Sequence, residues 1–147
     1  MSLIADIKAH EGYSKKVYKD TLGYDTIGIG FLVSSLELDE DVCDIILERR
    51  LKKNEAVLQR KLTFYNKSPI EVQNIIQNMY YQMGNRLFNF VKTLHYIENE
   101  NYRAASVEML DSLWAKQTPN RAKELSGRMA KVDENLWLFT WKRFYKS

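Results

Sequence analysis

The chain has 147 residues, of which 45% are hydrophobic and 28% charged, which is enough for one folded domain with a buried core. A disordered tail is therefore excluded. No apolar run is long enough for a membrane-spanning helix. Asp6, Lys8 and Glu11 interrupt the N-terminal apolar residues that a cleaved signal peptide would need. The single cysteine, Cys43, excludes a disulfide framework and favours synthesis in a reducing cytoplasm.

The net charge of +3 is unevenly distributed along the chain. Residues 1–48 carry four basic and ten acidic side chains, a net charge of −6. Residues 49–100 have a net charge of +5 and residues 101–147 a net charge of +4. A basic remainder behind an acidic first third suits an acidic, polymeric or surface-bound partner, although an ordinary mixed surface explains the same distribution.

The beginning of the chain indicates a small, turn-rich lobe. Four of the six glycines fall within the first 30 residues. Apolar residues between Leu3 and Ile7 predict a short helix that Gly12 ends. Val17–Tyr18 and Thr26–Ile29 predict two short strands on either side of a turn. We therefore expect a small β-hairpin lobe at about residues 13–38.

The rest of the chain is predicted to be helical. Asp39 is suited to cap a long helix at about residues 39–60, with its apolar residues on one face. This helix would link the small lobe to a larger helical lobe, made of residues 61–147 together with the N-terminal helix. The fold class expected is α+β and mostly helical.

A central helix is predicted to begin at Pro69. Ser68 precedes it as an N-cap, and Glu71 would close a capping box. The apolar residues that follow have helical spacing and predict burial on one side: Val72, Ile75, Ile76, Met79, Tyr80 and Met83.

Three more helices are predicted towards the end of the chain. The pair Thr118–Pro119 repeats the combination of cap and proline before a helix at Arg121–Met129. Amphipathic patterns predict further helices at Asn101–Trp114 and Asp133–Tyr145.

Two carboxylates of the front lobe could perform acid–base chemistry. Glu11 ends the first helix, and Asp20 follows a tyrosine at the end of a strand. Carboxylates on the two sides of a groove can act as general acid and general base if one is protonated and the other ionised. Acids at helix ends and turns are more often simply solvated, so the spacing alone leaves catalysis open.

Residues 11–30 have the sequence Glu-Gly-Tyr-Ser-Lys-Lys-Val-Tyr-Lys-Asp-Thr-Leu-Gly-Tyr-Asp-Thr-Ile-Gly-Ile-Gly. This segment closely resembles the active-site segment of phage lysozymes of the T-even type, glycoside hydrolase family 24. The shared pattern is Glu-Gly, Tyr-x-Asp, a glycine turn and Thr-Ile-Gly-x-Gly. Two further blocks, Gln82–Gly84 and Gln117–Lys123, are similar to the family and occur in the same order. The resemblance covers nearly the whole chain and implies a two-lobed lysozyme-like fold.

The resemblance implies a muramidase, which hydrolyses the β-1,4 bond between N-acetylmuramic acid and N-acetylglucosamine in bacterial peptidoglycan. By this likeness Glu11 is the general acid, and Asp20 with the Thr26 hydroxyl positions the attacking water. The family inverts the anomeric carbon, which needs roughly 6.5–9.5 Å between the two carboxyl groups. Arg121 matches an arginine that pairs with the catalytic glutamate, so we expect it to orient Glu11. The alternative for Arg121 is a surface arginine in the first turn of a helix.

The resemblance also implies residues that line the substrate groove: Tyr18, Phe31, Gln82, Gly84 and Phe90. Phe31 stands where the family commonly has a histidine, so this chain lacks the link from that histidine to an acid on the long helix. Thr26 is by itself only a good strand residue. Gly28 and Gly30 are expected to be structural, because a phosphate loop would need a trailing glycine and a lysine.

No metal and no cofactor is expected. The two histidines and the cysteine have no ligand spacing: His10, His95 and Cys43. The three tryptophans are expected to lie in the core rather than to form sugar platforms: Trp114, Trp137 and Trp141.

The biological role expected is that of a monomeric phage endolysin, made in the host cytoplasm and released to the cell wall or periplasm at lysis. Neither a nucleic-acid partner nor a stable membrane association is expected. An inactive peptidoglycan-binding or phage structural domain of the same fold is one alternative. A nucleic-acid binder is another, although the basic residues 49–147 contain no recognition motif. A lytic transglycosylase is the third, and it would need an acid but no second carboxylate such as Asp20.

Overall fold

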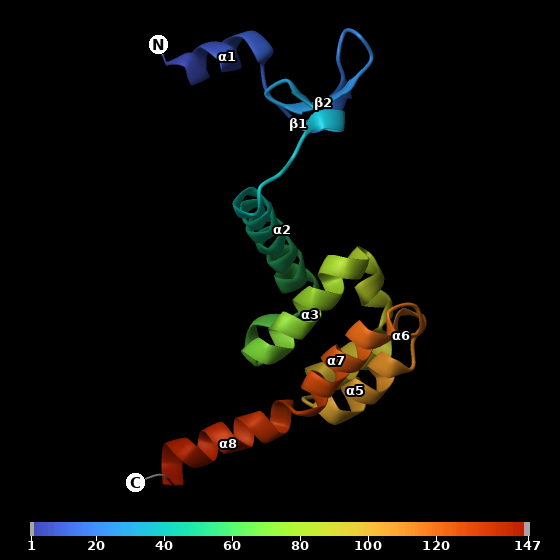
Figure 1. The fold of residues 1–147 in the computed structure, drawn as a ribbon. Coiled ribbons are helices and arrows are strands. Elements are labelled where there is room, and N and C mark those ends of the chain that lie inside the picture. Colours follow the sequence, from blue (N-terminus) through green and yellow to red (C-terminus); the bar gives the residue numbers. More distant parts are fainter. Residues whose placement is uncertain (1, 146–147) are drawn as a thin grey trace. The chain divides into compact units, whose positions relative to one another are not determined.

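The computed structural model describes residues 2–145. Two compact units make up the chain, Met1–Ile46 and Leu47–Ser147, and we call them the first and the second unit. The boundary falls inside a long helix. The elements of the first unit are α1 (Leu3–Glu11), β1 (Ser14–Lys19), β2 (Asp25–Gly28), β3 (Phe31–Leu32), the 3-10 turn Val33–Ser35 and the start of α2 (Glu40–Lys61) (Figure 1).

Local signals account for most of the first unit. The Ser2 hydroxyl accepts a hydrogen bond from the Ala5 amide at 3.2 Å and begins α1. Gly12 ends the helix, as predicted, with φ of +72° and an amide that donates to the Lys8 carbonyl. The three strands form an antiparallel sheet in the order β1-β2-β3. Only β3 was not predicted, because two residues are too few to show an alternating pattern.

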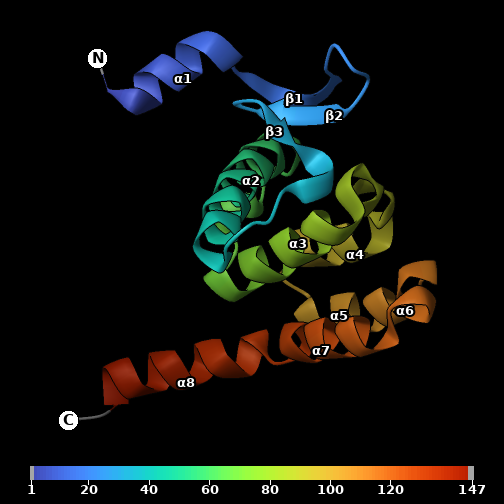
Figure 2. The same ribbon diagram turned by 45° about the horizontal axis from the view of Figure 1, so that its top comes forward.

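The second unit is helical. Its elements after α2 are the 3-10 turn Tyr65–Lys67, α3 (Ile70–Met83), the 3-10 segment Gly84–Asn89, α4 (Val91–Glu98), α5 (Tyr102–Leu110), α6 (Leu113–Gln117), α7 (Pro119–Ala130) and α8 (Val132–Tyr145). Helix α5 packs between α4 and α7, and α3 also contacts α7 (Figure 2). Together the two units confirm the predicted fold class, mostly helical α+β with one small antiparallel sheet.

One hydrophobic core organises the second unit. Five members of the stripe predicted on the central helix are buried in it: Val72, Ile75, Ile76, Met79 and Met83. The other helices add Leu58, Leu62, Tyr65, Leu87, Ile97, Tyr102, Ala105, Met109, Trp114, Ala122, Leu125, Met129 and Val132. Periodicity identified the α3 face because burial of an amphipathic helix follows its 3.6-residue repeat.

The predicted capping box at α3 is wrong. The Ser68 hydroxyl donates backwards to the Phe64 carbonyl at 2.9 Å, and none of the described helix amides donates to it. Pro69 takes the N-cap position, without a side-chain cap. The carboxylate of Glu71 instead forms an ion pair with Arg128 of α7 at 2.6 Å. Glu71 therefore interacts with a residue distant in the sequence, and not with the backbone amide of Ser68 as a capping box requires.

The predicted helix at Asn101–Trp114 is two helices. α5 ends at Leu110, and α6 begins after Ser112, whose hydroxyl accepts a hydrogen bond from the Ala115 amide at 3.1 Å. At α7, Pro119 occupies the first turn as predicted. The Thr118 hydroxyl donates to the Trp114 carbonyl and accepts no capping hydrogen bond from that helix.

The tryptophans divide into one core residue and two surface residues. Trp114 is buried, as predicted. Trp137 and Trp141 are exposed, so the prediction is wrong for them. Their helix, α8, is attached at its beginning, where Val132 is buried and Glu134 pairs with Arg103 of α5 at 3.3 Å.

The helix α1 belongs to the first unit. We predicted from the sequence that this helix is part of the helical lobe. That statement is about the two units together, and it stays a prediction. Within residues 2–145, none of the helices combines the length and hydropathy needed to cross a membrane.

Two buried tyrosines predict a loss of stability at high pH. Burial raises the pKa of Tyr65 and Tyr102 above the ordinary value of 10.0. The unfolded chain therefore releases these phenolic protons first, so the stabilisation is complete below about pH 10 and is lost as the pH rises through the folded-state pKa. We expect the urea-measured free energy of unfolding to fall above pH 10, and to fall less in Tyr65→Phe.

The matched control for this prediction is Tyr13→Phe, because Tyr13 is an exposed tyrosine. Tyr65→Phe also removes the hydroxyl that accepts the Gln77 amide at 2.9 Å, which should cost about 1 kcal/mol at neutral pH. An alkaline decline equal to that of the wild type would show that Tyr65 is not its source.

Candidate active site

Glu11 is the last residue of α1, and its carboxylate lies against the backbone of Gly30. A Cβ atom built on Gly30 would lie 2.6 Å from Glu11 Oε2 and 3.0 Å from Glu11 Cδ. Gly30 has φ of +69°, a conformation that favours glycine. The glycine therefore does two things here: it allows the turn between β2 and β3, and it leaves room for the Glu11 carboxylate.

Asp20 is held in the turn between β1 and β2 by one of its two carboxylate oxygens. Oδ1 accepts the amide of Leu22 at 2.9 Å and the amide of Tyr24 at 2.8 Å. The backbone amide of Asp20 donates a further hydrogen bond to the Tyr24 carbonyl at 2.9 Å. Among the described residues no hydrogen bond engages Oδ2. The turn thus orients the carboxylate and leaves its second oxygen for a ligand.

Thr26 is the one buried residue among the described residues of the first unit, with 4% of its surface exposed. It lies in β2, opposite Tyr18 of β1 and Leu32 of β3. Its hydroxyl donates to the Tyr24 carbonyl at 3.1 Å. Because this bond uses the only hydroxyl proton, Oγ1 can act towards a water molecule only as an acceptor.

Phe31 packs back on its own turn. Its ring lies over Gly28, where an added Cβ atom would come within 2.7 Å of the ring, and about half of the side chain is exposed. Tyr18, the other aromatic residue predicted for the groove in this unit, is also partly exposed. Their contact with substrate stays a prediction.

The second unit contains a pocket of about 550 Å³ that includes two of the predicted groove residues, Gln82 and Phe90. Gln82 Oε1 accepts the indole N–H of Trp114 at 2.8 Å, and the ring of Phe90 meets Trp114 edge-on with 6.1 Å between ring centroids. The lining also includes four charged residues, two basic and two acidic: Arg86, Lys92, Glu108 and Asp111. This pocket could bind a polar ligand that also presents an apolar surface.

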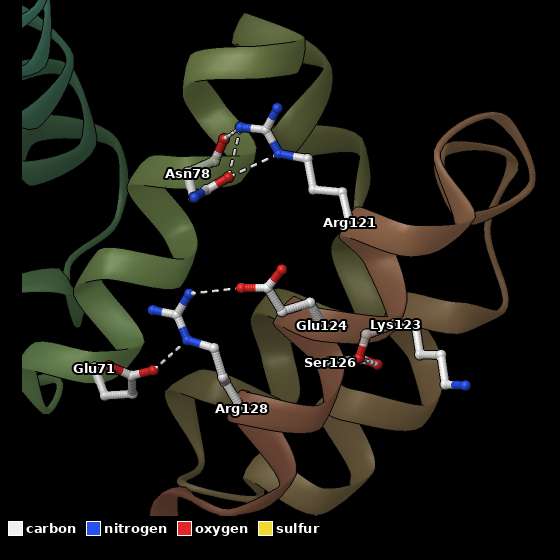
Figure 3. A network of polar contacts seen from close by, with 7 residues as sticks. All are labelled: Glu71, Asn78, Arg121, Lys123, Glu124, Ser126 and Arg128. Carbon is white, nitrogen blue, oxygen red and sulfur yellow. Dashed lines mark hydrogen bonds and ion pairs between the residues drawn. The ribbon is translucent and has the colours of Figure 1, made fainter.

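Gly84 and Arg121 occupy structural positions in the second unit. Gly84 ends α3 with φ of +59°. Arg121 extends from α7 to Asn78 of α3: its Nε donates to Asn78 Oδ1 at 2.8 Å, and its Nη2 donates to the Asn78 carbonyl at 3.1 Å (Figure 3). Arg121 is therefore more than a solvated surface arginine. Its expected pairing with Glu11, which belongs to the first unit, stays a prediction.

A second arginine, Arg128, ties α7 to α3 about two helical turns further along (Figure 3). It pairs with Glu71 at 2.6 Å and lies 3.9 Å from Glu124. The hydrogen bond that Arg128 donates to the Glu71 carboxylate raises the pKa of Arg128, against a smaller opposing effect of burial. Two arginines thus fix the orientation of the helix that carries Arg121.

Glu11, Asp20 and Thr26 all belong to the first unit, while Gln82 and Phe90 both line the pocket of the second. Sequence reasoning did not identify Asn78, nor the contact of Trp114 with Gln82 in the pocket. Their partners lie 43 and 32 positions away in the chain, and no local pattern signals such contacts. In the part of the chain that the structure describes, no three His, Cys, Asp or Glu side chains could hold a metal ion together.

A glutamate at the end of a short helix, an aspartate in a turn of the small sheet that follows, and then a helical unit fit a carbohydrate-cleaving hydrolase of the lysozyme class. Comparison with known proteins agrees: the phage lysozyme family matches residues 8–131. A protein of Dictyostelium discoideum named "Probable T4-type lysozyme 1" is 31% identical over 81% of this chain and 88% of its own length. "Probable T4-type lysozyme 2" of the same organism is 26% identical over the same shares.

The chain belongs to the phage lysozyme family. It is a lysozyme, a glycosidase of the muramidase type that acts on peptidoglycan. The resemblance in residues 11–30 is thereby confirmed at the level of the family.

Proposed function

We propose that this lysozyme is an inverting N-acetylmuramidase in which Glu11 is the general acid and Asp20 the general base. It cleaves the β-1,4 bond between N-acetylmuramic acid and N-acetylglucosamine. The observation that carries this proposal is the arrangement in the first unit. There the Glu11 carboxylate is seated on Gly30, and Asp20 is held by one oxygen with the other left over.

In the proposed reaction, Glu11 donates its proton to the glycosidic oxygen as the bond from that oxygen to the anomeric carbon breaks. A water molecule attacks the anomeric carbon from the opposite face of the sugar ring, and Asp20 Oδ2 takes its proton. Thr26 Oγ1 accepts the second hydrogen of that water, since its own proton is used on the Tyr24 carbonyl. The two carboxyl groups would then lie roughly 6.5–9.5 Å apart, as inversion requires.

Four residues are proposed to contact the substrate, as the resemblance implies: Tyr18, Phe31, Gln82 and Phe90. Gln82 and Phe90 are supported by their place in the pocket with Trp114. Gly84 is proposed to shape the backbone beside Gln82 rather than to contact sugar through a side chain.

The mechanism is tested by the products that the wild type and Asp20→Asn release from purified peptidoglycan. We expect the wild type to produce hydrolytic, reducing muramic-acid ends, first formed as the α anomer in proton NMR, and Asp20→Asn to produce none. The carboxamide keeps the hydrogen bonds at Oδ1 but cannot take a proton from water.

Three results would contradict this mechanism. Anhydro ends that persist in Asp20→Asn would show a lytic transglycosylase, which needs no second carboxylate. A β anomer as first product would show retention. Peptidoglycan binding without any product would show an inactive binding domain of the same fold.

We further propose that the protein is a phage endolysin, held in the host cytoplasm as a monomer and released to the wall at lysis. Its support is membership in the phage lysozyme family. Bacteria that produce it in the cytoplasm are expected to stay intact until chloroform permeabilises their inner membrane, and then to lose turbidity within minutes. Lysis without permeabilisation would contradict this role, and an inactive Asp20→Asn control separates enzymatic lysis from damage by the solvent.

A further inference from the structure

The two arginines that extend from α7 to α3 have acceptors of different charge. Arg128 lies near two carboxylates, Glu71 at 2.6 Å and Glu124 at 3.9 Å, so its positive charge is compensated. Arg121 is held by the neutral side-chain amide and the backbone carbonyl of Asn78. In the described part of the second unit, no carboxylate lies at ion-pair distance from Arg121. The second unit therefore holds this cation in place without pairing its charge.

Asn78 occupies one edge of the Arg121 guanidinium. Its Oδ1 accepts hydrogen bonds from Nε at 2.8 Å and from Nη2 at 2.5 Å, and its backbone carbonyl accepts from Nη2 at 3.1 Å. The other N–H groups of the guanidinium are those of Nη1. Nη1 points away from Asn78 (Figure 3), and no hydrogen bond engages it among the residues that the structure describes. Because the guanidinium is planar, fixing one edge also fixes the direction of Nη1.

We propose that Asn78 is a positioning residue of this lysozyme: it aims Nη1 of Arg121, with its charge intact, at a carboxylate from outside the second unit. An aspartate in place of Asn78 would hold the guanidinium more strongly, but it would also compensate the charge. An amide holds the guanidinium and leaves the charge for another group. The contacts that carry this proposal all lie between α3 and α7, so they do not depend on which surfaces of the second unit are covered.

The carboxylate can belong to the enzyme or to its substrate. On the enzyme it is Glu11, the residue that we expect Arg121 to orient. On the substrate it is a carboxyl group of peptidoglycan, such as that of N-acetylmuramic acid. Orientation of a catalytic group affects kcat, whereas uniform binding of substrate affects KM. The proposal rests on the proposed function, because hydrolysis of peptidoglycan is its readout.

The experiment measures kcat and KM on soluble peptidoglycan fragments, at the pH optimum of each variant. Asn78→Ala keeps the contact with the backbone carbonyl but loosens the guanidinium, so we expect kcat to fall about tenfold with little change in KM. In Arg121→Ala, the same substitution of Asn78 should cause no further loss, because Asn78 acts through Arg121.

Asn78→Asp tests the charge separately from the hydrogen bonds. The carboxylate can accept the same hydrogen bonds, so we expect the urea midpoint of unfolding to stay at or above that of the wild type. The charge of Arg121 is then compensated within α3, and kcat should fall about tenfold, as in Asn78→Ala. Unchanged stability with reduced turnover is a result that a purely structural asparagine would not give.

Glu71→Gln is the matched control on the same two helices. It removes the carboxylate that pairs with Arg128 and leaves the contacts of Arg121 with Asn78 in place. We expect a lower urea midpoint and a kcat close to that of the wild type. An equal loss of kcat in this control would assign the effect to the packing of α3 on α7.

Three results would overturn the proposal: wild-type kcat and KM in Asn78→Ala, wild-type kinetics in Asn78→Asp, or losses that add up in the double variant Asn78→Ala/Arg121→Ala. A rise in KM at unchanged kcat in both Asn78 variants would support the positioning role and identify the substrate as the source of the carboxylate. Failure of the proposed function is seen in the wild type instead. Anhydro ends or a β anomer would reject that mechanism and leave the comparison of the Asn78 variants valid.

Discussion

Glu11→Gln is expected to lower the rate of peptidoglycan hydrolysis by about 10²–10⁴-fold while the protein stays folded. Glutamine has almost the shape of glutamic acid, so it can take the place of the carboxylate against Gly30. It has no proton to give to the leaving oxygen, and the full contribution of the general acid is lost. The measurement is release of reducing ends from purified peptidoglycan, with circular dichroism to verify the fold.

Asp6→Asn is the matched control for Glu11→Gln. Asp6 lies in the first turn of the same helix and is exposed, so its substitution changes the charge of α1 equally but removes no catalytic group. We expect activity near that of the wild type. If Glu11→Gln kept a tenth or more of the wild-type rate, Glu11 would not be the general acid.

Gly30→Ala is expected to reduce turnover by about 10²-fold, because a methyl group would displace the Glu11 carboxylate from its position. The new Cβ atom would lie 2.6 Å from Glu11 Oε2, so that flexible side chain must swing away. The cost in folding free energy should stay near 1–2 kcal/mol, the ordinary penalty for alanine at a positive φ. Activity should therefore fall much further than stability. The measurements are kcat for activity and urea unfolding for the free energy of unfolding.

Gly23→Ala separates these two effects. Gly23 has φ of +84° in the neighbouring turn, and a Cβ atom there would meet nothing within 4 Å. It carries the same backbone strain without touching Glu11, but its turn holds Asp20, so we expect a similar loss of stability and a smaller loss of kcat than in Gly30→Ala. Equal losses of activity in both variants would assign the effect to strain in the lobe and not to Glu11.

Local interactions explain why much of the fold could be predicted. Gly12 ends α1 through a left-handed backbone and a hydrogen bond to a residue four positions back. The buried face of α3 follows its apolar repeat. The residues of the candidate site in the first unit all fall within the segment 11–31, which runs from the end of α1 through the sheet and its turns.

The error at the capping box comes from competition by a partner distant in the sequence. Glu71 had a suitable position for a capping box, but its carboxylate pairs with Arg128, 57 residues later. The helix expected at Asn101–Trp114 breaks because Ser112 caps a new helix, and Trp114 is then aimed at Gln82. A charge-assisted bond in a partly buried site outweighs a solvated local cap.

The sequence by itself determined the class of this protein: an α+β lysozyme whose glutamate, aspartate and threonine lie within 16 residues. Because these residues are close in the sequence, local turns and strand pairing determine where they lie, and the neighbouring residues determine those turns and strands. Only the tertiary structure revealed that Gly30 seats the Glu11 carboxylate, that Asn78 holds Arg121, and that the tryptophans of α8 are exposed. These facts depend on which faces of the helices and strands contact one another. The periodicity of a sequence predicts that a face is apolar, but it does not predict which element packs against that face.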